Sequence, residues 1–367
     1  MDKIKRFIDT YIDTETCNLR CHYCYIAQLN KFNNKLASFG HTKEEIRKAL
    51  SKKRLGGTCL INLCAGGETL LSNEVVPVIK ELLLEGHYVM VVTNGTVSHR
   101  FKEICNFDKK LLERLFFKFS YHYLELKRLN LLEIFFENVD IVRNAGASFT
   151  LEITPSDELI PYIDEIKKYT LEKIGSLPHI TIARDDRSNN IDILTKLDRE
   201  EYNKIWGTFD SKLFEFKNKI FYEKRKEFCY AGEYSAYLNL STGDLRQCLC
   251  GYVIDNIYAD LDRPIKFEAI GNNCELPHCY NGHAFLALGD IPDLEICEEY
   301  NYADLRNRCD KKGEWLKPSM KSFMSSKLYE NNDLYDEKRK KQINKNYKIK
   351  RIKYKMVRLK KKVFNKC

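Results

Sequence analysis

Residues 7–24 read FIDTYIDTETCNLRCHYC and combine an apolar, β-rich run with three closely spaced cysteines. The run from Phe7 to Thr14 predicts a β-strand, and Cys17, Cys21 and Cys24 follow it within eight residues. If the 14 cysteines were scattered over the 367 residues, this spacing would be expected roughly 0.02 times per chain. The spacing therefore indicates that the three thiols share one chemical task.

The strand before the cysteines is the first of six that alternate with helices. Apolar runs predict strands at Phe7 to Thr14, Cys59 to Ala65, Tyr88 to Thr93, Leu115 to Tyr121, Phe149 to Ile153 and His179 to Ala183. Helical periodicity lies between them, at Thr42 to Lys52, Glu74 to Glu85, Phe101 to Glu113 in two pieces, Leu129 to Arg143 and Ser156 to Glu172. This alternation predicts an α/β fold, an open (β/α)6 version of the eight-unit barrel, with its chemistry at the carboxyl ends of the strands.

Composition restricts the class of protein. Hydrophobic residues make up 44% and charged residues 31% of the chain, a globular balance that excludes general disorder. The sequence has no run of eighteen apolar residues, and it begins with a charged segment rather than a secretory leader, so we expect a cytoplasmic protein. Because the cytosol keeps thiols reduced, metal or iron-sulfur ligation explains the cysteines better than a disulfide framework.

Basic residues concentrate at the C-terminus. Residues 338–367 hold fifteen Lys and Arg and no Asp or Glu, so the net charge of +9 leaves −6 for residues 1–337. An apolar stripe at helical spacing runs through this tail and consists of Ile349, Ile352, Met356, Leu359 and Val363. The pattern favours peripheral contact with an anionic inner membrane surface. Docking on a partner or on the acidic body is an alternative, and nucleic acid is less favoured.

The chemistry of the triad depends on the number of ligands. Three thiolates can hold three corners of a four-iron cluster and leave one iron open, whereas a closed zinc site needs four protein ligands. A structural zinc site that takes His22 as its fourth ligand is the alternative.

Two further motifs stand at the ends of expected strands. Gly66-Gly67-Glu68 follows the second strand, where glycines permit close backbone approach and a carboxylate can pair with an ammonium group. Thr93-Asn94-Gly95 ends the third strand, and taken alone it indicates only a turn.

With these motifs in this order, residues 8–185 resemble the radical S-adenosylmethionine (SAM) superfamily. Its hallmark is a CxxxCxxC loop with an aromatic residue before the last cysteine, here Tyr23. The resemblance implies that Cys17, Cys21 and Cys24 hold a [4Fe-4S] cluster whose open iron is chelated by SAM. It further implies reductive cleavage of SAM to a 5′-deoxyadenosyl radical, which abstracts a substrate hydrogen, and an external electron donor such as flavodoxin or ferredoxin.

The same resemblance assigns the motifs after the second and third strands to the cofactor. It implies that Gly66, Gly67 and Glu68 contact the amino group of SAM and that Thr93 and Asn94 lie beside SAM.

Strand alternation supplies further candidates. Lys118, Ser120 and His122 share one face of the fourth strand, and Thr150, Glu152 and Thr154 share one face of the fifth. Their apolar neighbours should pack beneath helices, so these polar faces should line the barrel as a site. We expect Ser120 and Thr154 to face SAM or substrate and His122 and Glu152 to be catalytic candidates.

Arg184 ends the sixth strand. It could bind a carboxylate of SAM or substrate, but a solvated position beside Asp185 and Asp186 is the favoured interpretation.

Composition changes along the chain predict five segments. They are a radical SAM core at 1–185, a helical connector at 186–228, a cysteine-rich domain at 229–309, a helical segment at 310–337 and the basic tail at 338–367. In the third segment, thirteen residues separate Cys229 from Gly243 and four separate Gly243 from Cys248. This resembles the C-x(9-15)-G-x(4)-C opening of the SPASM and Twitch extensions, although the later cysteines depart from the full SPASM order.

That second resemblance implies one auxiliary [4Fe-4S] cluster. Its ligands would be Cys229, Cys248 and two of Cys250, Cys274 and Cys279. Zinc is the alternative, since His278 and His283 lie near Cys274 and Cys279 and offer nitrogen ligands. Cys59 and Cys64 are expected to be plain buried thiols, and no role is assigned to Cys105, Cys297, Cys309 and Cys367.

The expected function is thus hydrogen abstraction from a small-molecule, glycan or peptide substrate. The basic tail favours a sugar or surface-polysaccharide precursor, and a peptide-modifying maturase is the alternative. A non-catalytic iron-sulfur or zinc protein that acts through its tail is the alternative from another class.

Overall fold

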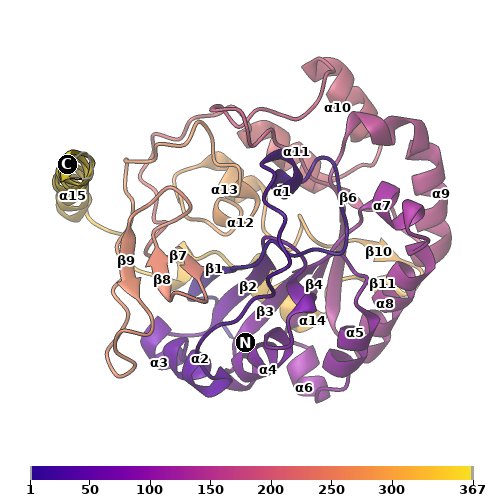
Figure 1. The fold of residues 1–367 in the computed structure, drawn as a ribbon, viewed down its shortest axis with the longest axis horizontal. Coiled ribbons are helices and arrows are strands. Elements are labelled where there is room, and N and C mark those ends of the chain that lie inside the picture. Colours follow the sequence, from indigo (N-terminus) through magenta and orange to yellow (C-terminus); the bar gives the residue numbers. More distant parts are fainter. Residues whose placement is uncertain (1, 365–367) are drawn as a thin grey trace.

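A nine-stranded sheet in the order β6-β5-β4-β3-β2-β1-β7-β8-β9 organises the molecule (Figure 1). The computed structural model describes residues 2–364, with side chains described up to residue 352. The strands are β1 (Arg6–Ile12), β2 (Cys59–Ala65), β3 (Tyr88–Thr93), β4 (Leu115–Ser120), β5 (Ser148–Ile153), β6 (His179–Ile180), β7 (Ser235–Asn239), β8 (Asp244–Arg246) and β9 (Val253–Asn256). Strands β1 to β6 pair in parallel, as the sequence predicts, and this parallel sheet fits a radical SAM type of core.

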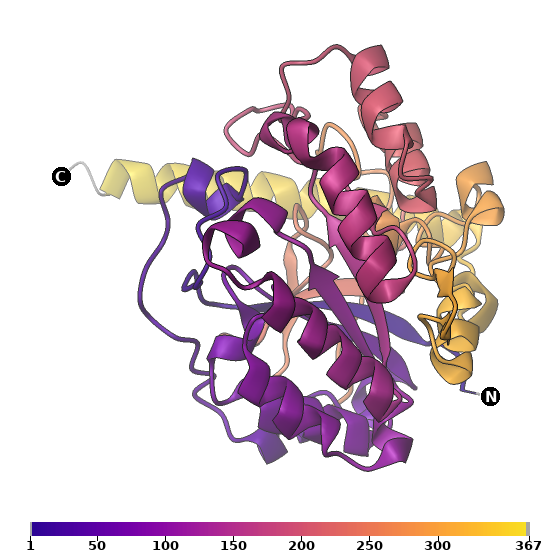
Figure 2. The ribbon, with the colours of Figure 1, turned by 90° about the vertical axis from the view of Figure 1, so that its right-hand side faces the viewer.

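The first half of the chain supplies helices, most of which lie along the outer side of these strands, as Figure 2 shows from the right of Figure 1. They are α1 (Tyr25–Gln28), α2 (Lys43–Ala49), α3 (Lys52–Leu55), η1 (Thr69–Leu71), α4 (Val75–Glu85), α5 (Ser98–Cys105), α6 (Lys109–Leu112), α7 (Tyr123–Arg128), α8 (Leu132–Ala145), η2 (Asp157–Tyr162) and α9 (Ile163–Ile174). Gly86 and Gly146 end α4 and α8 in the left-handed conformation, which glycine adopts without a Cβ penalty.

Three elements differ from the expected boundaries. The helix expected from Leu129 begins at Leu132, after the separate helix α7. The segment expected to be helical from Ser156 starts as the 3₁₀-helix η2, which contains Pro161, and becomes α-helical at Ile163. The sixth strand pairs over two residues only, His179 and Ile180, because the chain leaves the sheet edge after them.

The two faces of the strands have different environments. Phe117, Phe119 and Leu151 are buried under the outer helices in the first apolar core. On the inner face, Phe7 and Phe116 belong to a second core that the C-terminal part of the chain completes. This second core closes the amino ends of the strands, so the polar inner residues gather at the carboxyl ends.

The C-terminal half supplies the remaining elements. They are α10 (Arg199–Gly207), α11 (Lys212–Ile220), α12 (Gly282–Phe285), α13 (Glu295–Glu299), β10 (Cys309–Asp310), β11 (Gly313–Glu314), α14 (Pro318–Ser325), η3 (Tyr329–Asn331) and α15 (Glu337–Phe364). Strand β7 pairs in parallel with β1, and β7, β8 and β9 continue as an antiparallel meander. The cysteine-rich segment thus joins the barrel directly through a strand pair.

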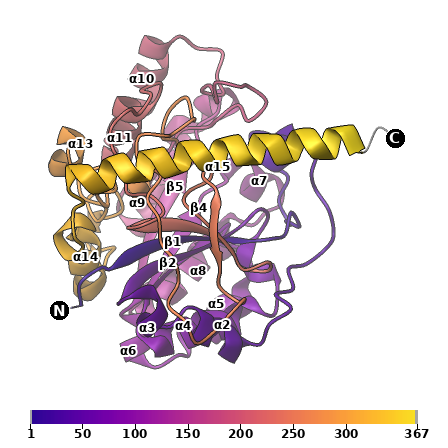
Figure 3. The same cartoon turned by 90° about the vertical axis from the view of Figure 1, so that its left-hand side faces the viewer.

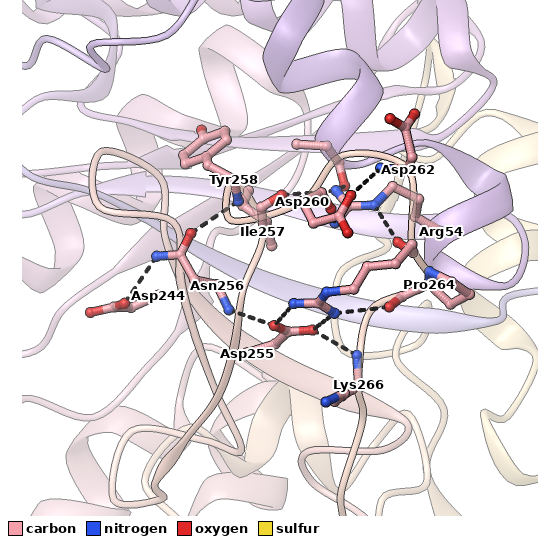
Figure 4. A network of polar contacts seen from close by, with 12 residues as sticks. Arg54, Asp244, Asp255, Asn256, Ile257, Tyr258, Asp260, Asp262, Pro264 and Lys266 are labelled. Atoms are coloured by element: carbon pink, nitrogen blue, oxygen red, sulfur yellow. Dashed lines mark hydrogen bonds and ion pairs between the residues drawn. The ribbon is translucent and has the colours of Figure 1, made fainter.

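A buried arginine ties this segment to the barrel (Figure 4). Arg54, at the end of α3, donates to the carbonyl oxygens of Ile257, Asp260 and Arg263 at 2.9, 2.6 and 2.9 Å. Arg263 in turn pairs with Asp255 at 2.7 Å. The loop after β9 is therefore held by the side chain of Arg54.

Helix α15 crosses one side of the molecule (Figure 3). It begins at Glu337, well before the apolar stripe, and packs Ile343 and Tyr347 into the second core. Ile349 and Ile352 are 43% and 58% exposed, and the side chains of Met356, Leu359 and Val363 lie outside the described part of the chain. Among the described helices, none is both long enough and apolar enough to cross a membrane.

Candidate active site

The cysteine loop after β1 is held by the Gly66-Gly67-Glu68 segment after β2. The amide of Gly67 donates to the carbonyl of Thr14 at 2.7 Å, and the amide of Glu68 donates to that of Thr16 at 3.0 Å. A Cβ at Gly67 would lie 1.9 Å from the Thr16 carbonyl oxygen. Only glycine fits at this position. The Gly66-Gly67-Glu68 segment therefore determines how closely the cysteine loop approaches the end of β2.

The two motifs and the triad line one cavity of about 100 Å³, which we call the triad cavity. The predicted site residues that line it are Cys17, Cys21, Cys24, Gly66, Gly67, Glu68, Thr93, Asn94, Ser120 and His122. Four loops at the carboxyl ends of β1 to β4 contribute to it. The structure thus brings these predicted residues together.

Glu68 is buried and accepts three hydrogen bonds. Its carboxylate binds the hydroxyl of Thr93 and the amide of Asn94, both at 2.7 Å, and the amide of Leu70 at 2.9 Å. Burial raises the pKa of Glu68, while these donors favour the charged form. A carboxylate has about four lone-pair directions, so about one remains for a ligand in the cavity.

Asn94 connects the third strand to the triad. Its side-chain amide lies 3.8 Å from the sulfur of Cys17 and donates to the side-chain oxygen of Asn18 at 2.8 Å. Asn18 donates in turn to the hydroxyl of Thr96 at 2.8 Å. The Thr93-Asn94-Gly95 turn therefore also orients the cysteine loop.

The aromatic residue of the loop contacts a predicted catalytic candidate. The hydroxyl of Tyr23 lies 2.7 Å from Nδ1 of His122. Burial, with a smaller contribution from Lys118, lowers the pKa of His122 to about 4. At neutral pH the His122 ring is therefore uncharged and held in place by Tyr23.

The triad fits a cluster whose irons each take one thiolate. Burial raises the pKa of Cys17 to about 11 and also raises the pKa of Cys21 and Cys24, so binding of iron would release protons from all three. No three His, Cys, Asp or Glu side chains within the described part of the chain converge on one point closely enough to hold a single metal ion. A four-iron cluster does not require such convergence.

The zinc ligand considered for the triad lies elsewhere. His22 pairs with Glu158 at 2.8 Å and is 44% exposed. It does not line the triad cavity.

A larger cavity of about 570 Å³, the central cavity, adjoins the triad cavity. Both are lined by Cys24, Val92 and His122. Thr154 and Arg184 line the central cavity, so Arg184 is not simply solvated. Cys64 also lines it and is not a plain core thiol.

Glu152 lines neither cavity. It is 3% exposed and forms ion pairs with Lys118, at 3.1 Å, and with Arg306. Lys118 and Arg306 do line the central cavity. The structure thus places Glu152 behind the wall, where it holds two cations.

Several lining residues have no sequence signal. Asp9 of β1 accepts hydrogen bonds from Asn62 at 2.7 Å and from Asn281 at 3.3 Å. Lys217 of α11 and His283 of α12 also line the central cavity. Strand alternation could have indicated Asp9, but Lys217 lies in an ordinary amphipathic helix.

A second group of cysteines lines an apolar pocket of about 40 Å³, the cysteine pocket. Its thiols are Cys229, Cys248, Cys274 and Cys279. Cys250 lies outside the lining, with its sulfur 3.3 Å from that of Cys248. Leu249, Tyr280 and Asn281 line both this pocket and the central cavity, which therefore lies between the two groups of cysteines.

The histidines considered as zinc ligands do not line the cysteine pocket. His278 lies against Phe221, with ring centroids 3.9 Å apart. His283 lines the central cavity instead. Of the remaining cysteines, Cys297 is buried, Cys309 is exposed, and Cys367 lies outside the described residues.

The radical SAM superfamily model matches residues 11–156. This stretch contains the triad, the Gly66-Gly67-Glu68 motif and the Thr93-Asn94-Gly95 turn. The match supports the superfamily for this part of the chain, and it implies an enzyme that uses a [4Fe-4S] cluster and SAM. No curated protein sequence matches the chain.

Several solved structures superpose on this chain at low sequence identity. Streptococcus suis SuiB superposes with a TM-score of 0.49 and 13% identity over 71% of this chain and 65% of SuiB. Native anSMEcpe with bound AdoMet superposes with a TM-score of 0.46 and 15% identity over 94% of this chain and 97% of that one. The chain therefore spans about 65% of the length of SuiB.

Proposed function

We propose that this chain, whose residues 11–156 match the radical SAM superfamily, is a radical SAM enzyme that abstracts a hydrogen atom from a substrate in the central cavity. The observation that carries the proposal is the triad cavity, where three thiols meet the acceptor Glu68 and open onto the larger cavity. The cluster and SAM, when bound, supply the electron and the 5′-deoxyadenosyl group for this chemistry.

The chain's own residues position SAM in this proposal. Glu68 accepts a hydrogen bond from the SAM ammonium in its remaining lone-pair direction, and the charge-assisted bond fixes the orientation of that group. Asn94 and Ser120 supply polar contacts on the neighbouring strand ends. His122 lies between the two cavities, and its ring is neutral. It can therefore form a hydrogen bond with a bound molecule without adding a charge to the site.

The cysteine pocket is proposed to hold one auxiliary [4Fe-4S] cluster. Its ligands are Cys229, Cys248, Cys274 and Cys279, since all four line the pocket, and Cys250, whose sulfur lies 3.3 Å from that of Cys248, is the alternative. Four thiolates would complete its coordination, which favours electron transfer over substrate binding at an open iron. The position of the central cavity between the two groups of cysteines suits transfer of an electron from a substrate radical.

The size of the central cavity favours a small substrate. A volume of about 570 Å³ lies in the range of small-molecule sites. A sugar or a surface-polysaccharide precursor fits this range, as does one residue of a peptide.

The test is anaerobic reconstitution with iron and sulfide, followed by dithionite and SAM. We expect about eight irons per chain and formation of 5′-deoxyadenosine. A variant with Cys17, Cys21 and Cys24 changed to Ala should retain about four irons and form no 5′-deoxyadenosine. Cys105→Ala, at a cysteine outside both sites, is the matched control and should behave as the parent.

Three results would contradict the proposal. Zinc in place of iron, or a fully loaded parent that does not cleave SAM, would assign the protein to the non-catalytic binding class. Loss of iron and activity in the Cys105→Ala control would remove the special role of the triad.

A further inference from the structure

The wall of the central cavity carries five cations, Lys31, Lys118, Arg184, Lys217 and Arg306, and three carboxylates, Asp9, Glu15 and Asp186. Apart from Lys31 after α1, these cations come from four separate segments: Lys118 of β4, Arg184 after β6, Lys217 of α11 and Arg306 before β10. Two of them, Lys118 and Arg306, are paired with Glu152. Arg184 and Lys217 are not paired with Glu152.

Lys217 is 7% exposed, and its ammonium group forms no ion pair or hydrogen bond with any described residue. The guanidinium of Arg184 lies 4.4 Å from the centroid of the Tyr280 ring and has no carboxylate within ion-pair distance in the described chain. A buried ammonium without a charged partner is costly. Burial and the neighbouring Arg184 and Lys118 hold the pKa of Lys217 well below its usual range.

His283 extends the same part of the wall. Its Nδ1 atom is buried without a hydrogen-bond partner among the described residues, and it lies on α12, next to α11. Lys217, Arg184 and His283 thus line one cavity, and none of the carboxylates in its wall, Asp9, Glu15 and Asp186, forms an ion pair with Lys217 or Arg184. An anion there would complete all three.

The three residues are not part of the wall around the cysteine triad. Lys217, Arg184 and His283 line the central cavity but not the triad cavity. Arg184 stacks on Tyr280, which lines both the central cavity and the cysteine pocket. The cationic wall therefore reaches the cysteine pocket through Tyr280, and it also reaches the triad loop, because Gln28 donates to the carbonyl of Arg184 at 2.9 Å.

We propose that the substrate is a small molecule with a carboxylate or phosphate group, and that Lys217 and Arg184 bind this group in the central cavity. The inference rests on the proposed function for the reaction but not for the binding. An anchored anion on one wall would leave the rest of the substrate facing the triad cavity, where the hydrogen is removed.

The test measures anion binding without turnover. The loaded protein with saturating SAM is heated in inorganic phosphate, in acetate or in chloride at the same ionic strength, and the unfolding midpoint is recorded. Phosphate or acetate should raise the midpoint of the parent by about 2 to 4 °C more than that of Lys217→Met. The larger of the two shifts distinguishes a phosphate from a carboxylate substrate.

Two variants keep the comparison matched. Lys212→Met, at an exposed lysine of the same helix, should respond to the anions as the parent does. Arg184→Gln provides a second test should Lys217→Met fail to fold, and it should show the same loss of response.

Equal shifts in the parent and in both wall variants would overturn the proposal. So would a loss of SAM affinity in Lys217→Met that equals the loss of anion response, because the cations would then serve SAM. Formation of 5′-deoxyadenosine without substrate is followed in parallel. Its absence from a parent that still binds the anion would contradict the proposed function alone.

Discussion

At the scale of single residues, the contact between Gly67 and Thr16 decides where the cysteine loop lies. An added Cβ would meet the Thr16 carbonyl oxygen at 1.9 Å, so Gly67→Ala must displace the backbone of the loop. We expect Gly67→Ala to lose most triad iron and to reduce 5′-deoxyadenosine formation about 100-fold or more, since small misplacements of reacting groups are costly.

Iron analysis and product chromatography check this prediction. Gly207→Ala is the control, because a Cβ at Gly207 meets nothing within 4 Å. Retention of parental iron by Gly67→Ala would show that the loop tolerates the displacement.

The side chain of His87 makes the stability of the protein depend on pH. Its Nδ1 accepts from the amide of Cys59 at 3.1 Å, and its Nε2 lies 2.8 Å from the carbonyl of Leu50. A second proton would have to enter at Nδ1, against the Cys59 N–H. Burial accordingly lowers the pKa of His87 to about 4.

A folded-state pKa below the unfolded value gives stability that is present above about pH 6.5 and is lost as the pH falls towards 4. The contribution is about 3 kcal/mol over this window. His87→Gln should therefore lose less stability than the parent between pH 7.5 and pH 5. Urea unfolding at the two pH values measures it, with the exposed His99→Gln as control. An unchanged slope in His87→Gln would contradict the assignment.

At the scale of elements, the sequence pattern of a short segment predicts those features that depend on contacts within that segment. The alternation of Phe117, Lys118, Phe119 and Ser120 predicts both the strand and its two faces, because each side chain faces a fixed side of the pleat. The pairing of β7 with β1 was not predictable in this way, since it joins residues more than 200 positions apart. Lys217 was missed for the same reason, because its role depends on which cavity α11 meets.

The junction between α3 and the loop after β9 depends on the side chain of Arg54. Arg54 joins α3 to the loop after β9 through three carbonyl oxygens, and it also donates to Ala49 at 2.6 Å. Arg54→Met should leave these buried carbonyls without a donor and lower the free energy of unfolding by about 2 to 4 kcal/mol.

Hydrogen exchange should then become faster at residues 255–266 than elsewhere. Lys53→Met, at the exposed neighbouring lysine, is the control and should change neither quantity. Uniform acceleration across the chain would show that Arg54 acts on global stability rather than on this junction.

At the scale of the whole molecule, the first half of α15 is held to the body of the protein. The side chains of this helix are described up to residue 352. Ile343 and Tyr347 are buried, and Lys350 and Arg351 pair with Glu268 and Glu275 at 2.7 and 3.0 Å. These contacts support docking of that half on the acidic body. Ile349 and Ile352 remain exposed beside them, so the predicted membrane contact depends on the C-terminal half.

A chain ending at residue 352 separates the two alternatives. It keeps Ile343, Tyr347 and both ion pairs, so it should fold as the full chain does and give the same unfolding midpoint. If the tail binds anionic lipid, the full chain should float with vesicles that contain anionic lipid, and the shortened chain should stay in solution. Raising the salt concentration should release the full chain, because the attraction to the surface is screened. Equal flotation of both chains, or flotation that ignores lipid charge, would leave α15 as a helix that serves the body of the protein alone.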